Sequence, residues 1–215
     1  MNATSDKRYM SLALVLGGRG EGNVWPNPSV GCVLVKNDRI IGRGWTQPGG
    51  RPHAEVMALR QAGPAAKNAT AYVTLEPCVH RGKTGPCVDE LISAGIERCV
   101  VATKDVDPRV AGKGLIKLKS SGIKVDFGCL VEKANFSHRG FFKKVLDGRP
   151  RVTLKLALSL DGRIGTYKGE SQWITGSLAR RNVHALRAKH DAVLIGGGTA
   201  RKDNPSLTAV SYTHL

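Results

Sequence analysis

The sequence predicts an α/β layer fold with a largely buried sheet, because short apolar runs alternate with amphipathic helical stretches along its 215 residues. Two further observations support this class. The run Val30 to Val35 has strand length and is apolar at every position, which is typical of a strand buried on both faces. Apolar residues make up 41% of the chain, enough to build a core.

The expected elements follow in order. Residues 5–17 form a helix with Ser5 as its N-cap and Gly17–Gly18 as its stop. Asn37–Asp38 joins the strand 30–35 to a returning strand 39–45 in a hairpin. Helices are then expected at 53–62, 88–94, 114–120 and 131–146, and strands at 69–75, 99–103 and 123–127.

The segment Asp147 to Pro150 is predicted to end a first domain of about 147 residues. A second pattern follows, with a strand at 152–159, a helix at 178–188, a strand at 192–195 and a glycine run at Gly196–Gly198. The 65 or so residues of this second pattern are few for an independent α/β domain.

Charge and cysteine usage restrict the class of protein. The formal net charge of +16 suits an anionic partner such as a phosphorylated small molecule, although a solvated basic surface explains it equally well. No apolar run is long enough for a membrane span, and residues 1–9 lack the apolar part of a signal peptide. We therefore expect a soluble cytoplasmic protein with no membrane or nucleic-acid partner. In a reducing compartment, five cysteines favour metal or catalytic roles over disulfides.

The most informative motif is His53-Ala54-Glu55 followed by Pro77-Cys78 and Cys87. One imidazole and two thiolates suit Zn²⁺ and leave a fourth position open for water. Glu55 would be the catalytic residue that moves protons between this water and a leaving group. Zinc nucleobase deaminases combine the same residue types, but here eight residues rather than two separate the cysteines. A structural zinc site, closed for instance by His80, or three unconnected core residues are the alternatives. Cys32, Cys99 and Cys129 are interpreted as ordinary buried residues.

Several longer motifs carry a family resemblance. They are Pro26 to Cys32, Pro52 to Val56, Thr74 to Cys87, Val110 to Gly114, Lys155 to Gly162 and Gly169 to Thr175. Together they resemble the bifunctional riboflavin-biosynthesis deaminase–reductases over residues 5–208. The resemblance implies a three-layer cytidine-deaminase-like domain with a mixed sheet over residues 1–147. It implies that residues 148–215 begin a dihydrofolate-reductase-like α/β domain.

The resemblance also implies two reactions and their residues. The first domain would hydrolytically deaminate a phosphoribosylated diaminopyrimidinone with one Zn²⁺ ion. The second would reduce the ribose of the product with NADPH. The substrate-binding positions implied for the deaminase are Asn27, Thr46, His80, Lys83, Asp105 and Asp107. Those implied for the reductase are Ser171, Arg187 and Leu207 at the sugar phosphate, and Ala157, Trp173, Thr199 and Asp203 at the cofactor. Trp173 as a core aromatic, and Lys83 as a solvated loop residue, remain alternatives.

Departures from the family pattern are informative. Thr46 stands where a His is common, Asp107 where an Asn is usual, and Gly85 where a proline is usual. The pattern stops near Thr208, and residues 210–215 fit no continuation of it, so we expect a truncated or non-native C-terminus and an incomplete reductase.

A deaminase of another nucleobase or nucleoside is the alternative within enzymes. A basic RNA-binding protein with structural zinc is the alternative outside them. A homo-oligomer is compatible with the sequence.

Overall fold

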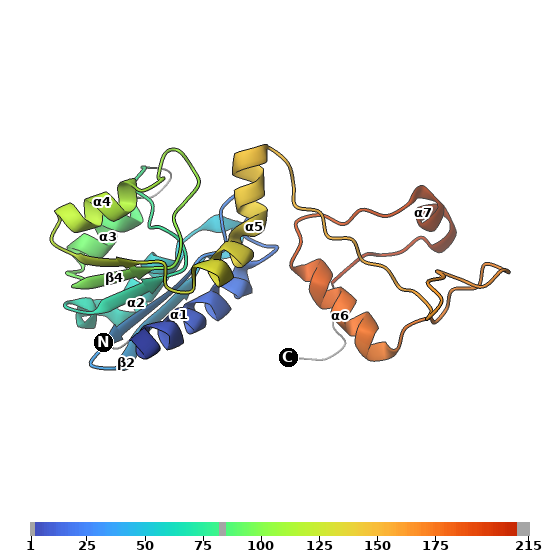
Figure 1. Cartoon of the computed structure of the whole chain (residues 1–215), viewed down its shortest axis with the longest axis horizontal. Coiled ribbons are helices and arrows are strands. Elements are labelled where there is room, and N and C mark those ends of the chain that lie inside the picture. The colour runs from blue at the N-terminus through green and yellow to red at the C-terminus, as the bar shows by residue number, and fades with distance from the viewer. Residues whose placement is uncertain (1–2, 82–84, 210–215) are drawn as a thin grey trace. The chain divides into compact units, whose positions relative to one another are not determined.

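The structure is a computed structural model, and it describes residues 3–81 and 85–209. The chain divides into two compact units, Met1–Arg151 and Val152–Leu215. Figure 1 traces both units, coloured from blue at the N-terminus to red at the C-terminus. Among the described residues, no helix has the length and apolar character needed to cross a membrane.

The first unit is built around one five-stranded sheet with the strand order β2-β1-β3-β4-β5. The strands are β1 (Gly31–Lys36), β2 (Arg39–Trp45), β3 (Thr70–Val73), β4 (Arg98–Val101) and β5 (Lys124–Phe127). The pairs β1–β2 and β1–β3 are antiparallel, whereas β3–β4 and β4–β5 are parallel. The mixed sheet expected from the resemblance is therefore present.

Helices cover both faces of this sheet (Figure 1). They are α1 (Ala3–Gly17), α2 (Ala54–Ala62), α3 (Cys87–Ser93), α4 (Lys113–Ser120) and α5 (Val131–Asp147). Successive residues of a strand point to opposite faces. Accordingly, Val33 packs with Tyr9 and Met10 of α1, whereas Leu34 packs in the core shared by α2, α3 and α4. The result is a three-layer arrangement, which explains why β1 is apolar at consecutive positions.

The hairpin between β1 and β2 confirms the turn predicted at Asn37–Asp38. Both residues adopt left-handed backbone conformations, with φ of 49° and 58°. Two-residue hairpin turns of this hand match the twist of the flanking strands, and Asn and Asp tolerate them better than most residues do. The hydroxyl of Tyr9 donates to the Asp38 carboxylate at 2.6 Å, which ties the turn to α1.

Two glycines of β2 allow helix α2 to approach the sheet closely. A Cβ atom on Gly44 would lie 2.1 Å from the carbonyl oxygen of Ala54, and one on Gly42 would lie 2.3 Å from that of Ala58. Contacts this short are impossible for a real side chain, so both positions require glycine. The close packing fixes where α2 begins, and His53 and Glu55 lie at that end of the helix.

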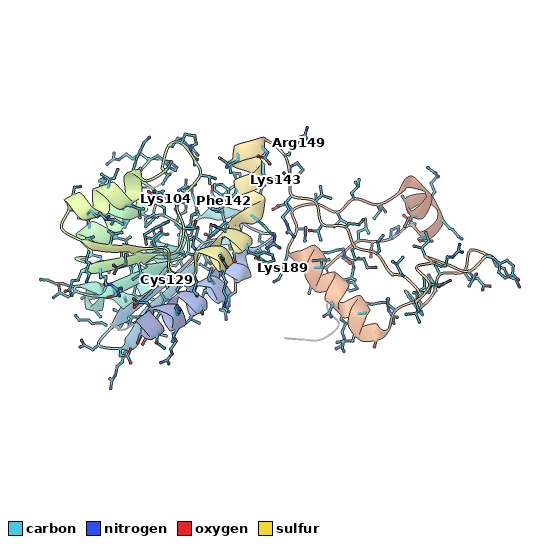
Figure 2. All side chains as sticks on the ribbon, viewed as in Figure 1. Lys104, Cys129, Phe142, Lys143, Arg149 and Lys189 are labelled. Carbon is cyan, nitrogen blue, oxygen red and sulfur yellow. The ribbon has the colours of Figure 1, made fainter. Side chains whose placement is uncertain are left out.

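Most elements of the first unit begin and end within a few residues of their predicted positions, but the predicted cap of the first helix is wrong. Helix α1 begins at Ala3, so Ser5 lies inside the helix rather than at its N-cap. The helix begins two residues before Ser5, so the first residue with the chemistry of an N-cap does not mark its start. Cys32 and Cys99 are fully buried as expected, whereas Cys129, labelled in Figure 2, is only partly buried.

The second unit contains helices α6 (Ser177–Ala188) and α7 (Gly197–Asp203). Helix α6 confirms the helix predicted at 178–188, and the glycine run at Gly196–Gly198 forms the beginning of α7. The strands predicted at 152–159 and 192–195 are wrong, because neither segment is a strand in the structure. A strand requires a neighbour to bond its N–H and C=O groups, and the described part of this unit pairs no strand with either segment.

No described residue of 152–209 is buried. Large apolar side chains are exposed throughout, among them Leu154 (79%), Leu160 (107%) and Leu194 (97%). Apolar side chains alternate along 152–158, as they often do in strands, but Leu154, Leu156 and Leu158 remain 79%, 58% and 42% exposed.

Candidate metal and active site

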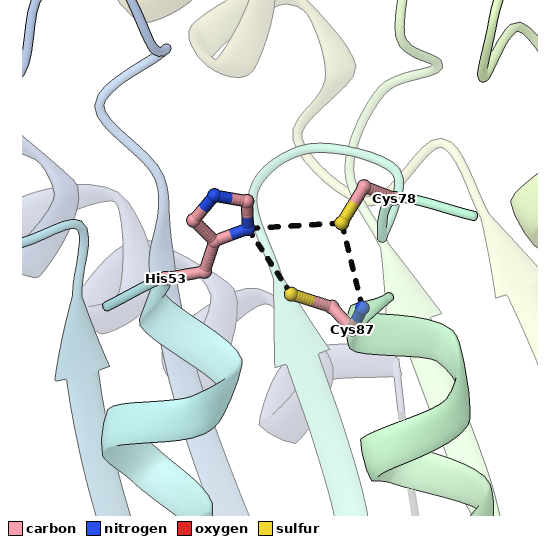
Figure 3. A group of neighbouring side chains, drawn as sticks. All are labelled: His53, Cys78 and Cys87. Atoms are coloured by element: carbon pink, nitrogen blue, oxygen red, sulfur yellow. Dashed lines mark hydrogen bonds between the residues drawn. The ribbon is translucent and has the colours of Figure 1, made fainter. Parts of the chain in front are cut away.

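Three groups that can bind a metal converge in the first unit (Figure 3). They are His53 at the N-cap of α2, Cys78 in the segment after β3, and Cys87 as the first residue of α3. Their ligand atoms all lie within 4.8 Å of one another. Nδ1 of His53 is 3.2 Å from Sγ of Cys87 and 3.7 Å from Sγ of Cys78. The three residues predicted as ligands are thus brought together.

Local structure explains this convergence. His53 has an extended backbone (φ −71°, ψ 161°) directly before α2, and Pro86 occupies the equivalent place before α3. Strands β3 and β4 are parallel, so their C-terminal ends lie at the same edge of the sheet. Cys78 follows β3 at this edge and lies close to the N-termini of α2 and α3. The backbone N–H of Cys87 donates to Sγ of Cys78 at 3.4 Å. A helix N-terminus favours negative charge, which suits a thiolate there.

The electrostatics of the cluster favour a charged sulfur. The hydrogen bond from Cys87, followed by that from His53, lowers the pKa of Cys78 to about 4 from the usual 9. The hydrogen bond with Cys78 in turn raises the pKa of His53. A thiolate is the form of cysteine that binds metal ions. One imidazole nitrogen and two sulfurs match the donor set of zinc, so the residues present fit this ion.

Glu55 lies beside the cluster in the first turn of α2 and is only 3% exposed. Burial, followed by the charge of Cys78, raises the pKa of Glu55 above its usual value. A hydrogen bond with Cys87 acts in the opposite direction and places the carboxyl group next to the ligand set. A buried carboxyl with a raised pKa is suited both to accept and to return a proton near neutral pH.

Two predicted substrate residues, Asn27 and Thr46, lie near the start of β1 and the end of β2. The amide nitrogen of Asn27 donates to the carbonyl of Gly50 at 2.7 Å and lies 3.5 Å from Nε2 of His53. The hydroxyl of Thr46 accepts from the backbone N–H of Val30 and donates to the carbonyl of Pro28. Asn27 therefore lies against the ligand set, while Thr46 holds the backbone of the loop that contains Asn27.

The other predicted deaminase residues follow β3 and β4. His80 is partly buried, and its Nδ1 atom has no hydrogen-bond partner among the described residues. Lys83 lies outside the described residues. The Asp105 side chain is 9% exposed, and burial raises its pKa to about 6. Asp107 receives a hydrogen bond from Arg109, which lowers the pKa of its carboxyl group.

Glu76 is a residue whose role sequence reasoning missed. Its carboxylate is 3% exposed and accepts four backbone N–H groups. Oε1 accepts from Gly114 (2.8 Å) and Leu115 (3.2 Å), and Oε2 accepts from Gly112 (2.9 Å) and Asp105 (3.3 Å). Glu76 therefore joins the segment that carries Cys78 to the loop after β4 and to the beginning of α4. An acidic residue within an apolar stretch just before a metal ligand was the available signal.

Gly114 is needed for the same contact. A Cβ atom at this position would lie 2.4 Å from the carbonyl oxygen of Pro77, the residue before Cys78. The beginning of α4 can pack against the metal-binding segment only because no side chain intervenes. Gly114 thus has a structural reason in the approach of α4 to Glu76 and Pro77, whereas Gly112 has a left-handed backbone with φ of 88°.

The residues predicted for the second unit lie on exposed or partly exposed segments. Trp173 is 69% exposed, with the Arg180 guanidinium 4.3 Å from the centre of its ring. Ser171, Thr199 and Asp203 are exposed, whereas Ala157, Arg187 and Leu207 are partly buried. Arg187 is hydrogen-bonded to the neighbouring His184. The expected cofactor and sugar-phosphate contacts in this unit remain predictions.

Comparison with known proteins agrees with this site. The family described as the cytidine and deoxycytidylate deaminase zinc-binding region matches residues 3–103, and the RibD C-terminal domain matches residues 150–214. The riboflavin biosynthesis protein RibD of Escherichia coli is 51% identical over 203 residues, which are 94% of this chain and 55% of that protein. The RibD of Aquifex aeolicus is 50% identical over 94% of this chain and 57% of its own length.

The chain belongs to the RibD family. It spans about half the length of these curated relatives. Solved RibD structures share its fold. That from Acinetobacter baumannii has a TM-score of 0.88 and 48% identity over 96% of this chain and 58% of its own. That from Thermotoga maritima, described as a diaminohydroxyphosphoribosylaminopyrimidine deaminase and 5-amino-6-(5-phosphoribosylamino)uracil reductase, has a TM-score of 0.91 and 43% identity over 96% of this chain and 60% of its own. The predicted family and fold class are confirmed.

Proposed function

We propose that the first unit of this RibD-family chain is a zinc-dependent aminohydrolase that deaminates a phosphoribosylated diaminopyrimidinone. The observation that carries the proposal is the convergence of His53, Cys78 and Cys87 within 4.8 Å beside the buried carboxyl of Glu55. The activity in the description of the Thermotoga maritima relative supports this choice of substrate. The motifs shared with the family, His53 to Glu55 and Pro77 to Cys87, support it as well.

His53, Cys78 and Cys87 would hold the zinc ion, with three protein ligands leaving one position for water. When bound, zinc supplies Lewis-acid activation that makes water a good nucleophile near neutral pH. The chain contributes the charge that retains the ion, because hydrogen bonds from Cys87 and His53 already lower the pKa of Cys78.

Glu55 supplies the proton transfers. Its carboxylate accepts a proton from the attacking water, whose oxygen forms a bond to the ring carbon that carries the amino group. The carboxyl group then returns this proton to the leaving nitrogen, and the carbon–nitrogen bond breaks to release ammonia. The second proton of the former water moves from the new hydroxyl group to the adjacent ring nitrogen, so that water and the amino-substituted ring give the oxo-substituted ring and ammonia. The raised pKa of Glu55 favours such a shuttle, because it makes the carboxylate a stronger base than a solvated one.

Other residues would orient the substrate. Asn27 lies 3.5 Å from the His53 ring, where its amide can face the edge of a pyrimidine. His80 and Lys83, which follow β3 in the sequence, are assigned to the ring and the sugar phosphate. Asp105 and Asp107, after β4, are assigned as further substrate-binding positions. The net charge of +16 favours an anionic small molecule. We place this activity in the cytoplasm without a nucleic-acid or membrane partner.

For the second unit we propose a contribution to NADPH-dependent reduction of the ribosyl side chain in the complete protein. Ala157, Trp173, Thr199 and Asp203 are assigned to NADPH. Ser171, Arg187 and Leu207 are assigned to the sugar phosphate. Because residues 152–209 bury no described side chain, we expect this chain alone to show no NADPH-dependent turnover.

The deaminase proposal is tested by measuring ammonia release from the diaminopyrimidinone ribosyl phosphate, with cytidine, guanine and tRNA as competing candidates. Wild-type protein is expected to act on the first compound only. Glu55→Gln is expected to lose activity while retaining zinc, because it removes the proton shuttle but none of the ligands. Ammonia release from another base would assign a different deaminase. Retained activity in Glu55→Gln would contradict the assigned role.

A further inference from the structure

The loop after β4 contains a close pair of opposite charges, Asp107 and Arg109. Nε of Arg109 donates to both carboxylate oxygens of Asp107, at 2.9 and 3.0 Å, and Nη2 donates to Oδ2. The backbone N–H of Arg109 also donates to Oδ1 at 2.9 Å. A planar guanidinium bound to a carboxylate through two nitrogens is the most favourable geometry for such a pair.

This pair lies on a loop that is held against the metal-binding segment. The backbone N–H of Asp107 donates to Oδ1 of Asp105 at 2.9 Å, and the N–H of Asp105 donates to Oε2 of Glu76 at 3.3 Å. Glu76 is two residues from Cys78. Asp107 is also close enough to His80 for the two side chains to interact electrostatically. The carboxylate of Asp107 therefore lies on the side of the loop that faces the segment between the two cysteines.

The negative charge of Asp107 is unfavourable for binding a phosphorylated substrate at this loop. Arg109 lowers the pKa of Asp107, so Asp107 is ionised at neutral pH. An ionised carboxylate repels a phosphorylated substrate that binds nearby. The side chain of Asp107 is only 13% exposed, whereas that of Arg109 is 68% exposed. Water alone therefore screens Asp107 poorly, and Arg109 is the cation that touches it directly.

We propose that Arg109 is a specificity-determining residue of this chain, which neutralises Asp107 so that the loop after β4 accepts a phosphorylated substrate. This inference rests on the proposed deaminase function. Asp107 and Arg109 together carry no net charge, so the pair presents no unpaired acid to the substrate. Arg109 acts through Asp107 and needs no contact with the substrate.

The expected effect is moderate and depends on salt. For an assumed separation of about 8–10 Å between one unpaired charge and a doubly charged phosphate, with the dielectric constant of water between them, binding changes about three- to tenfold at low ionic strength. Screening over about 10 Å at 0.1 M salt reduces this effect strongly. Since the interaction is equally present before and during the reaction, it changes KM rather than kcat.

The test is a comparison of KM and kcat for ammonia release at low salt. Arg109→Gln is expected to raise KM about three- to tenfold with kcat retained. In an Asp107→Asn background, Arg109→Gln is expected to change KM by less than about twofold relative to Asp107→Asn alone. Arg109→Lys keeps the charge and should raise KM less than Arg109→Gln does. Arg60→Gln removes an exposed cation from the last turn of α2, far along the helix from His53, and is the matched control for net charge.

The outcomes separate the two proposals. If wild type releases no ammonia from the phosphoribosyl substrate, the proposed function is wrong and this inference falls with it. If wild type is active but Arg109→Gln has an unchanged KM, only this inference is wrong. If Arg109→Gln raises KM as much in the Asp107→Asn background as it does in the wild type, Arg109 does not act by neutralising Asp107 and the inference is wrong. A KM increase that persists at high salt would equally contradict the electrostatic role.

Discussion

Replacing Glu76 with Gln is expected to destabilise the first unit strongly, although the two side chains have nearly the same shape. Each carboxylate oxygen of Glu76 accepts two backbone N–H groups. In Gln, one oxygen becomes an NH₂ group, which cannot accept a hydrogen bond and faces two donors. Two N–H groups are then left without an acceptor in a site where the side chain is 3% exposed. At about 1–3 kcal/mol for each buried unsatisfied donor, the loss is about 2–6 kcal/mol.

The assay is urea unfolding of the full chain followed by circular dichroism, with zinc affinity measured by chelator competition. Glu76→Gln should lower the unfolding free energy by the amount above. It should also weaken zinc binding, since the bonds of Glu76 hold the segment that carries Cys78. Glu97→Gln, an exposed acid of the same unit, is the control and should change stability by less than about 0.5 kcal/mol. Equal midpoints for Glu76→Gln and wild type would refute the reasoning.

Three further perturbations test other parts of the account. Removing the metal with a chelator should abolish ammonia release, and adding zinc should restore it; activity that survives complete removal would contradict the metal requirement. His138 is 2% exposed, and burial lowers its pKa to about 4 from 6.5. Its neutral form therefore contributes stability that is fully present above pH 6.5 and is lost as the pH falls toward 4. Relative to His138→Gln, the wild type should lose about 3 kcal/mol over that range in parallel urea titrations, and a constant difference would exclude the effect. Gly44→Ala should cost at least about 2 kcal/mol in thermal unfolding, because its Cβ would overlap the Ala54 carbonyl, whereas Gly18→Ala, with open space around it, should change stability little.

The sequence predicted the first unit well because local signals and long-range packing agree there. The apolar run of β1, the Asn37–Asp38 turn and the glycine stops each specify the structure that the sheet also requires. The same approach failed in the second unit. The alternating residues of 152–159 have the pattern of a strand, but a strand forms only beside a partner, and the described residues supply none.

In the site, residues with a recognisable chemistry could be predicted from the sequence, whereas roles that depend on tertiary contacts could not. His53, Cys78, Cys87 and Glu55 could be predicted because their residue types suit zinc and proton transfer, wherever the chain places them. The role of Glu76 could not be predicted, because its four donors come from residues 29 to 39 positions further along the chain. The position of Thr46 within the loop, bonded to Val30 and Pro28, likewise depends on tertiary contacts that no local pattern encodes.

The central claim is that His53, Cys78 and Cys87 bind one zinc ion and leave a position open for water. X-ray absorption spectroscopy of the zinc-loaded chain tests this claim most directly, since it counts sulfur and nitrogen or oxygen neighbours separately. The account predicts two sulfur atoms at about 2.3 Å and two lighter atoms at about 2.0–2.1 Å. A spectrum with three or four sulfur neighbours, or two histidine rings in place of one, would contradict it.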